Sequence, residues 1–158
     1  FVHLPLEDDS FASECIQQEN LVVALPANHP LAKQEKIAVR SLADELFILF
    51  PRHLGMGLYD KIMALCEQGN FIPKVAQEAI QMQTIIGLVS AGMGIAIVPA
   101  SLQNLQRQGV VYRAIAQTTP LVETAVVWKA GEVTPVLRQF LSVVGKITSC
   151  ELKFQLKA

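Results

Sequence analysis

The residues best suited to binding chemistry lie in a short segment between a strand-like run and a helix-like run. Arg52 and His53 follow Pro51 there, and Gly55 and Gly57 stand just beyond them. A guanidinium can hold a carboxylate through two parallel hydrogen bonds, and the amide groups at a helix N-terminus also attract anions. His53 adds one further donor. We therefore predict that Pro51, Arg52 and His53 contact an anionic ligand, the simpler alternative being a solvated loop.

The sequence lacks the constellations that catalysis or metal binding would need. The segment 87–92 misses the G-x-S-x-G spacing around Ser90 by one position, so it does not form a nucleophile elbow. Gly55-Met56-Gly57 lacks the third glycine of a dinucleotide fingerprint, and the three histidines have no metal-ligand spacing. We expect no catalytic residue, no metal and no cofactor.

Composition and charge narrow the class of protein further. The 158 residues are 51% hydrophobic and 17% charged, which is typical of a globular chain with one core or two small lobes. The formal net charge of -1 gives no basic field that would bind a phosphate backbone directly. Cys15, Cys66 and Cys150 show neither metal nor disulfide spacing, which predicts reduced thiols in a cytoplasmic protein. No apolar run reaches the roughly 18 residues of a membrane span, so we expect no membrane partner.

Hydrophobic spacing predicts alternating strands and helices from residue 20 onward. Continuous apolar runs predict buried strands, and apolar residues at three- and four-residue steps predict helices. Gly92 ends one helix, Gly94 suits a close approach of two backbones, and Thr134 caps the last helix. This alternation indicates an α/β fold with a mostly parallel sheet and ligands at the carboxyl ends of its strands. The predicted strands are 20–25, 46–50, 73–78, 95–98, 110–113 and 122–129, and the predicted helices are 56–68, 82–91 and 135–147.

Several stretches, in order, resemble the effector-binding domain of LysR-type transcriptional regulators. The run Gly87 to Pro99 looks like the signature G-L-V-x-x-G-x-G-[IV]-x-[LI]-[VL]-P. Leu21 to Ala32 is similar to the family's crossover strand and the hydrophobic-P-x-x-H-P-L turn that follows it. Phe1 to Pro5 looks like the strand just upstream, and Thr124 to Val143 looks like the return strand and closing helix. The resemblance covers nearly the whole chain apart from the tail after Ser149.

The resemblance implies a two-lobed fold like that of the type 2 periplasmic binding proteins, with a small effector held between the lobes. Lobe II would be residues 22–123, and lobe I, residues 1–21 plus 124–158, would be incomplete because its first elements are missing upstream. Family members contact DNA through an N-terminal helix-turn-helix outside this chain. The uncovered sheet surface of an incomplete lobe also favours a homo-oligomer.

The resemblance adds a second group of candidate ligand contacts. In the family, the strand-to-helix turn that corresponds to residues 78–84 faces the cleft from the same lobe, where Gln81 offers neutral donors and acceptors. Solvation on a helix surface is the alternative account. His3 stands at the end of the first strand and could project from lobe I, although strand packing explains it equally well. The additional candidates are Ala79, Ile80, Gln81, Met82 and His3.

Taken together, the sequence predicts a domain that senses a small organic acid and thereby changes promoter binding by its parent protein. A periplasmic-type solute-binding protein of a transport system is the first alternative, because it shares the two-lobed form. An α/β enzyme remnant is the second, which the missing catalytic constellation disfavours.

Overall fold

The computed structural model describes residues 2–4, 10–131 and 133–147. The chain divides into two compact units, which we treat separately: unit 1 comprises Phe1–Gln18 and Val122–Ala158, and unit 2 comprises Glu19–Leu121. Whether these units are the lobes expected at 1–21 plus 124–158 and at 22–123 stays a prediction.

The central sheet of unit 2 is built around a strand that is buried along its whole length. Every residue of β3 is buried, because both faces of the sheet are covered, and this explains the continuous apolar run in its sequence. β3 pairs antiparallel with β7 on one side and with β8 on the other, while β4 pairs parallel with β8. The strands of this sheet are β3 (Leu21–Pro26), β4 (Lys36–Ile37), β7 (Ala96–Pro99) and β8 (Val110–Ile115).

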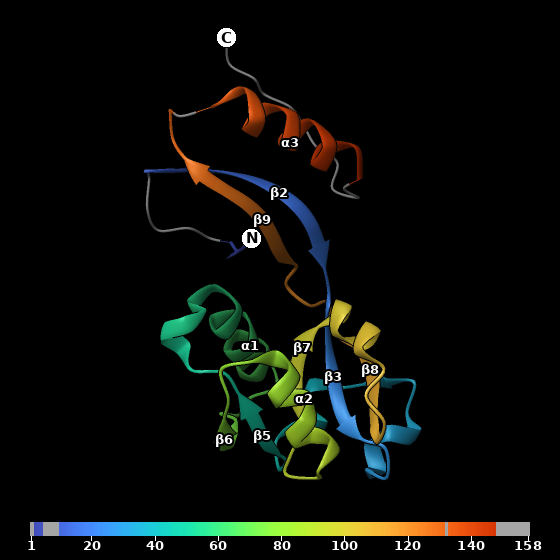
Figure 1. Ribbon diagram of the computed structural model, residues 1–158. Coiled ribbons are helices and arrows are strands. Elements are labelled where there is room, and N and C mark those ends of the chain that lie inside the picture. Colours follow the sequence, from blue (N-terminus) through green and yellow to red (C-terminus); the bar gives the residue numbers. More distant parts are fainter. Residues whose placement is uncertain (1, 5–9, 132, 148–158) are drawn as a thin grey trace. The chain divides into compact units, whose positions relative to one another are not determined.

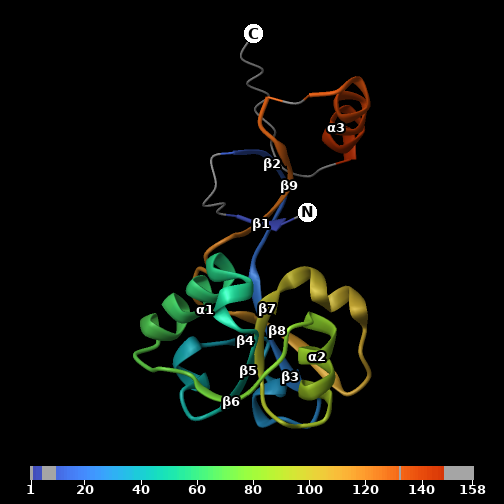
Figure 2. The same ribbon diagram turned by 60° about the vertical axis from the view of Figure 1, so that its left-hand side comes forward.

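A parallel strand pair carries the two long helices of unit 2. β5 (Leu46–Leu49) and β6 (Lys74–Glu78) pair in parallel, and a parallel bridge from Phe47 to Ile95 attaches β5 beside the start of β7. Helix α1 (Met56–Gln68) connects β5 to β6, and α2 (Met82–Ser90) connects β6 to β7. The two helices lie on opposite faces of these strands (Figures 1 and 2). The α/β class is thus confirmed, but the pairing in unit 2 is mixed: β4–β8, β5–β6 and the 47–95 bridge are parallel, and β3–β7 and β3–β8 are antiparallel.

The helices of unit 2 follow the spacing of their apolar residues. The buried face of α1 consists of Leu58, Ile62, Leu65 and Cys66, and that of α2 of Ile85, Ile86 and Val89. Burial raises the pKa of the Cys66 thiol to about 11, which keeps it protonated and unreactive. Four short 3-10 helices complete the unit: η1 (Pro30–Lys33), η2 (Val39–Leu42), η3 (Arg52–Leu54) and η4 (Ala100–Leu105).

The two glycines after α2 are required by the backbone. Gly92 has a φ of 76° where the helix ends, a conformation that glycine adopts without strain. A Cβ atom on Gly94 would lie 2.5 Å from the carbonyl oxygen of Leu46. This close approach allows the amide of Ile95 to donate to the same oxygen at 2.8 Å. The predicted role of both glycines is confirmed.

The described part of unit 1 is a three-stranded sheet and one helix. β9 lies between β1 and β2, and its pairing with β1 is antiparallel. The hydroxyl of Thr134 accepts a hydrogen bond from the amide of Leu137 at 3.2 Å, which confirms the predicted cap. β2 was not predicted, because its polar residues give no continuous apolar run. The elements are β1 (Val2–His3), β2 (Phe11–Glu19), β9 (Val122–Lys129) and α3 (Pro135–Ile147).

Two further observations concern membrane-spanning helices and the cysteine side chains. Within the described ranges, no helix is long and apolar enough to cross a membrane. Cys15 is half-buried in β2 and Cys66 is buried in α1, and neither forms a disulfide with another described residue. Cys150 lies outside the described residues.

Candidate functional site

The two predicted ligand-binding turns emerge side by side from one edge of the sheet. Leu49, the last residue of β5, lies opposite Glu78, the last residue of β6. The amide of Ala79 donates to the carbonyl of Leu49 at 2.9 Å, so the second turn is bonded to the end of the first strand. Because the two strands are parallel, both turns lie at the carboxyl ends, where open α/β sheets bind ligands. The structure therefore brings residues 51–53 and 79–82 to neighbouring positions.

The first turn is held against α1 by packing of aromatic rings. Phe50 is buried, and its ring meets that of Tyr59 edge-on with centroids 6.1 Å apart. Gly55 lies close to the same ring, since a Cβ atom there would stand 3.0 Å from Phe50 Cε2. Arg52 and His53 lie in η3 and are exposed, while Pro51 before them is half-buried. The backbone of the turn is thus fixed while its two cationic or titratable side chains face solvent.

Arg52 already binds a carboxylate, and that carboxylate belongs to the chain itself. Its Nε donates to Asp60 Oδ1 at 2.8 Å, and its Nη2 donates to Asp60 Oδ2 at 2.9 Å. The hydrogen bonds and charge of Arg52 lower the pKa of the Asp60 carboxyl below its usual value. The two side chains are 57% and 52% exposed, so this bidentate pair lies in water and contributes little to stability.

Sequence reasoning missed Asp60. The one available signal was its position four residues after Met56, which puts both residues on the same side of α1 near the turn that carries Arg52. The spacing places Asp60 on the side of α1 near the turn, but it does not show whether the turn brings Arg52 within hydrogen-bonding distance. The chain runs from η3 through Gly55, which has a φ of -174° and a ψ of 63°, before α1 begins.

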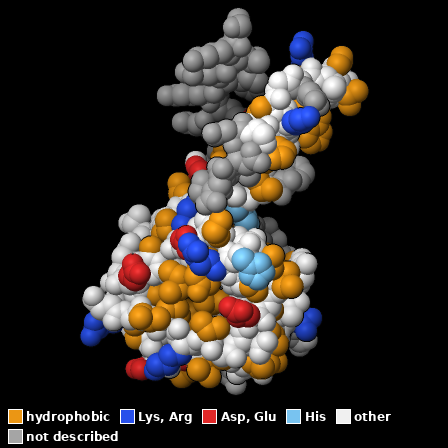
Figure 3. Space-filling model, turned by 90° about the vertical axis from the view of Figure 1, so that its left-hand side faces the viewer, with side chains coloured by type: hydrophobic (Ala, Val, Ile, Leu, Met, Phe, Trp, Pro, Cys, Tyr) orange, Lys and Arg blue, Asp and Glu red, His pale blue; other side chains and the backbone are white. Residues whose placement is uncertain are grey.

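The second turn is electrically neutral and partly apolar. Ile80 is 67% exposed, Gln81 is exposed, and Ala79 and Met82 are half-buried. Gln81 occupies the N-cap position of α2 without a capping hydrogen bond from its side chain. Figure 3 shows hydrophobic side chains gathered on the side of unit 2 that carries α1, β5 and β6. The first turn thus offers a cation, and the second offers apolar surface and amide groups.

His3 belongs to the other unit. It lies in β1 opposite Thr124 of β9, and its Nδ1 is 3.4 Å from the hydroxyl oxygen of Thr124. The side chain is exposed. A contact of His3 with the same ligand stays a prediction. Among the described residues, no group of three or more His, Cys, Asp or Glu side chains could hold a metal ion.

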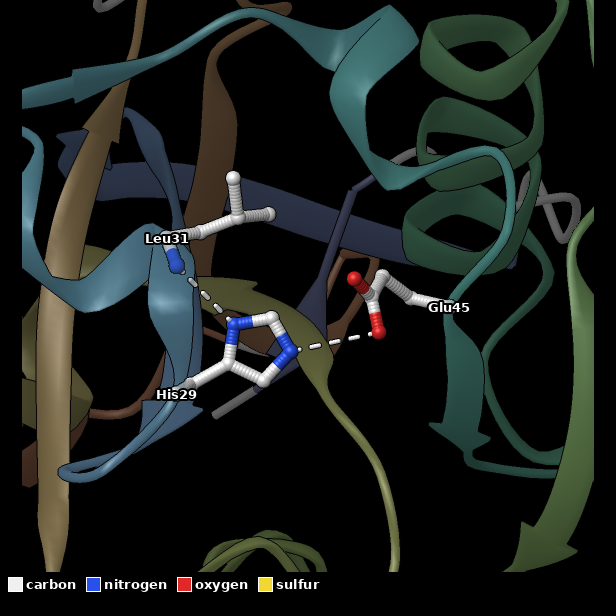
Figure 4. A network of polar contacts seen from close by, with 3 residues as sticks. All are labelled: His29, Leu31 and Glu45. Carbon is white, nitrogen blue, oxygen red and sulfur yellow. Dashed lines mark hydrogen bonds and ion pairs between the residues drawn. The ribbon is translucent and has the colours of Figure 1, made fainter.

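A second polar network on unit 2 explains the histidine of the H-P-L turn (Figure 4). Nδ1 of His29 accepts a hydrogen bond from the amide of Leu31 at 3.2 Å and caps η1. Since Nδ1 is the acceptor, Nε2 carries the hydrogen and donates to Glu45 Oε2 at 3.2 Å. Glu45 precedes β5, so His29 fastens the turn after β3 to the turn before β5. This contact is structural.

The fold and the paired turns define a small-molecule-binding domain of the α/β class. Residues 1–147 match the LysR substrate binding domain family. The chain is 34% identical over 142 residues to the HTH-type transcriptional regulator AlsR of Bacillus subtilis, a match that covers 90% of this chain and 47% of that regulator. It is 38% identical over 133 residues to the HTH-type transcriptional regulator YnfL of Escherichia coli, covering 84% of this chain and 45% of that protein. The chain thus spans about half the length of the curated relatives it matches.

The fold is also that of a solved domain with a bound small molecule. The effector binding domain of QuiR in complex with shikimate superposes with a TM-score of 0.76 at 25% identity, covering 89% of this chain and 66% of that one. The chain belongs to the LysR substrate-binding domain family, which confirms the resemblance seen in the sequence. The two-lobed, periplasmic-binding-like fold class is confirmed with it, and a transport protein is no longer the competing interpretation.

Proposed function

We propose that this chain is the effector-sensing domain of a transcriptional regulator and that its effector is a small organic acid. The observation that carries the proposal is the Arg52 guanidinium, held in bidentate carboxylate geometry on a turn at the carboxyl end of β5. The neutral turn 79–82 stands beside it and would contact the rest of the ligand. The proposed effector contacts are Pro51, Arg52, His53, Ala79, Ile80, Gln81, Met82 and His3.

The chemistry of a related complex supports the class of ligand. Shikimate, the molecule bound to the QuiR domain, is a carboxylic acid that is ionised at neutral pH. A single guanidinium with an apolar neighbour suits such a molecule, because the fork fixes the carboxylate and the neighbour covers the carbon skeleton. The Arg52 turn of this chain provides the guanidinium, and the turn 79–82 beside it provides the apolar neighbour.

The proposal extends to the parent protein. Its effector domain has two lobes, residues 1–21 plus 124–158 and residues 22–123. Closure on the effector changes the geometry of a homo-oligomer, and a helix-turn-helix segment outside this chain contacts the promoter. The regulator acts in the cytoplasm and catalyses no reaction. Two facts support this extension: AlsR is named as an HTH-type transcriptional regulator, and the match covers 47% of its length.

A ligand screen with one matched control tests the proposal. Organic acids, sugars and amines are titrated against the full-length regulator by calorimetry. We expect an acid to bind and Arg52→Ala to weaken it about 10- to 100-fold, the range for losing hydrogen bonds between charged groups. Arg107→Ala removes an exposed arginine elsewhere on unit 2 and should leave the affinity unchanged. Binding of amines or sugars alone, or equal affinities of the two variants, contradicts the proposal.

A further inference from the structure

Asp60 occupies the hydrogen-bonding edge of Arg52 that an acid ligand would use. The Nε and Nη2 donors form one side of the guanidinium fork, and both are taken by the Asp60 oxygens at 2.8 and 2.9 Å. Asp60 lies in the second turn of α1, and its side chain is more than half exposed. The Asp60 side chain can therefore rotate into solvent without disturbing a buried group.

We propose that Asp60 is an internal competitor for the ligand and lowers the affinity of the site for acids. In the unliganded chain its carboxylate fills the fork of Arg52, and the carboxylate of the ligand displaces it. This inference rests on the proposed function, since it specifies how the same site is regulated. It makes Asp60 a residue that regulates access to Arg52 rather than a contact of the ligand.

Displacement is favoured over shared binding for an electrostatic reason. A guanidinium has a second edge, formed by Nη1 and Nη2, and a ligand carboxylate on that edge would share Arg52 with Asp60. That arrangement would put two carboxylates around a single positive charge, and they would repel each other. If the ligand takes the Nε and Nη2 edge instead, Asp60 moves into water, where its charge is well solvated. The exchange replaces one bidentate pair by another of the same geometry.

The competitor lowers the apparent affinity for every acid, because each ligand must displace Asp60 before it binds Arg52. A ligand that offers only a carboxylate gains no more from Arg52 than Asp60 does, and Asp60 is tethered to the same unit. A ligand that also contacts the turn 79–82 gains the additional interactions that tip the exchange in its favour. Removing the charge of Asp60 should therefore tighten the binding of every acid by the same factor.

The test compares Asp60→Asn with its control in the full-length regulator. Asparagine keeps the size of the side chain but has no charge to compete for Arg52. The probes are shikimate, with acetate as the minimal carboxylate, titrated at constant ionic strength. We expect Asp60→Asn to tighten binding of both by about two- to fivefold, because an exposed ion pair opposes exchange only weakly. Glu67→Gln removes an exposed charge from the last turn of the same helix and should have no effect.

The outcomes distinguish this inference from the proposed function. Tighter binding in Asp60→Asn that disappears in the double variant with Arg52→Ala supports the inference. Weaker or unchanged binding in Asp60→Asn, with Arg52→Ala still damaging, overturns it and makes Asp60 a residue that orients Arg52, while the proposed function stands. If no acid in the wider screen binds either protein, the proposed function fails and the inference fails with it. Unfolding midpoints of all variants exclude loss of fold as the cause.

Discussion

Two polar contacts of unit 2, His29 with Glu45 and Arg52 with Asp60, differ in exposure and in what else their residues do. The His29 and Glu45 side chains are 15% and 31% exposed, and the same imidazole accepts the amide hydrogen of Leu31. Arg52 and Asp60 are more than half exposed, and their contact joins the turn after β5 to the helix that follows it. A partly desolvated contact with a backbone role resists exchange, whereas a pair in water can change partners at little cost. The fold is held by the first contact, and the second remains open to a ligand.

The largest effect on stability is expected from His29→Ala. This change removes the cap of η1 and leaves Glu45 without its partner in a half-buried position. We expect the free energy of unfolding to fall by about 1–2 kcal/mol, as for a lost helix cap or hydrogen bond. Chemical denaturation measures it. Arg52→Ala is the matched comparison, and its midpoint should stay within error of the unchanged chain; equal losses in the two variants would abolish the distinction between the contacts.

A smaller loss is expected from Glu45→Gln. The amide oxygen can still accept the hydrogen of His29 Nε2, so only the charge is lost and the cap of η1 remains. We expect a decrease of about 0.5–1 kcal/mol, the difference between a charged and a neutral hydrogen bond. The same denaturation series measures it. A loss as large as that of His29→Ala would show that the charge of Glu45, and not the cap, carries the contact.

The elements with strong periodicity were predictable, but the direction of the strands was not. The bounds of α1 and β9 agree with the prediction, because each has a continuous pattern of its own. The apolar run of β3 indicates burial on both faces, but it carries no information on whether its neighbours run parallel or antiparallel. β2 pairs with β9 in the sheet, and this pairing, rather than a run of apolar residues, defines it as a strand.

The candidate site was predictable to the level of the two turns. Their side-by-side position follows from parallel strands, and the register of β5 and β6 confirms it. The state of Arg52 was not predictable, because Asp60 reaches it through a turn whose path depends on η3 and Gly55. A local pattern shows which side chains are available, whereas the folded loop decides which of them are already paired.

The smallest expected effect is that of pH on the competition between Asp60 and the ligand for Arg52. Arg52 lowers the pKa of Asp60, so the pair is fully present above the carboxyl's unfolded pKa of about 3.9 and is lost only as the pH falls through the lower folded value. Between about pH 5 and 8 the competing charge is therefore constant. We expect the affinity ratio of Asp60→Asn to the unchanged regulator to stay the same across that interval, as measured by calorimetry with shikimate. A ratio that approaches one as the pH falls from 8 to 5 would mean that Asp60 is already being protonated, which an exposed carboxylate paired with Arg52 should resist.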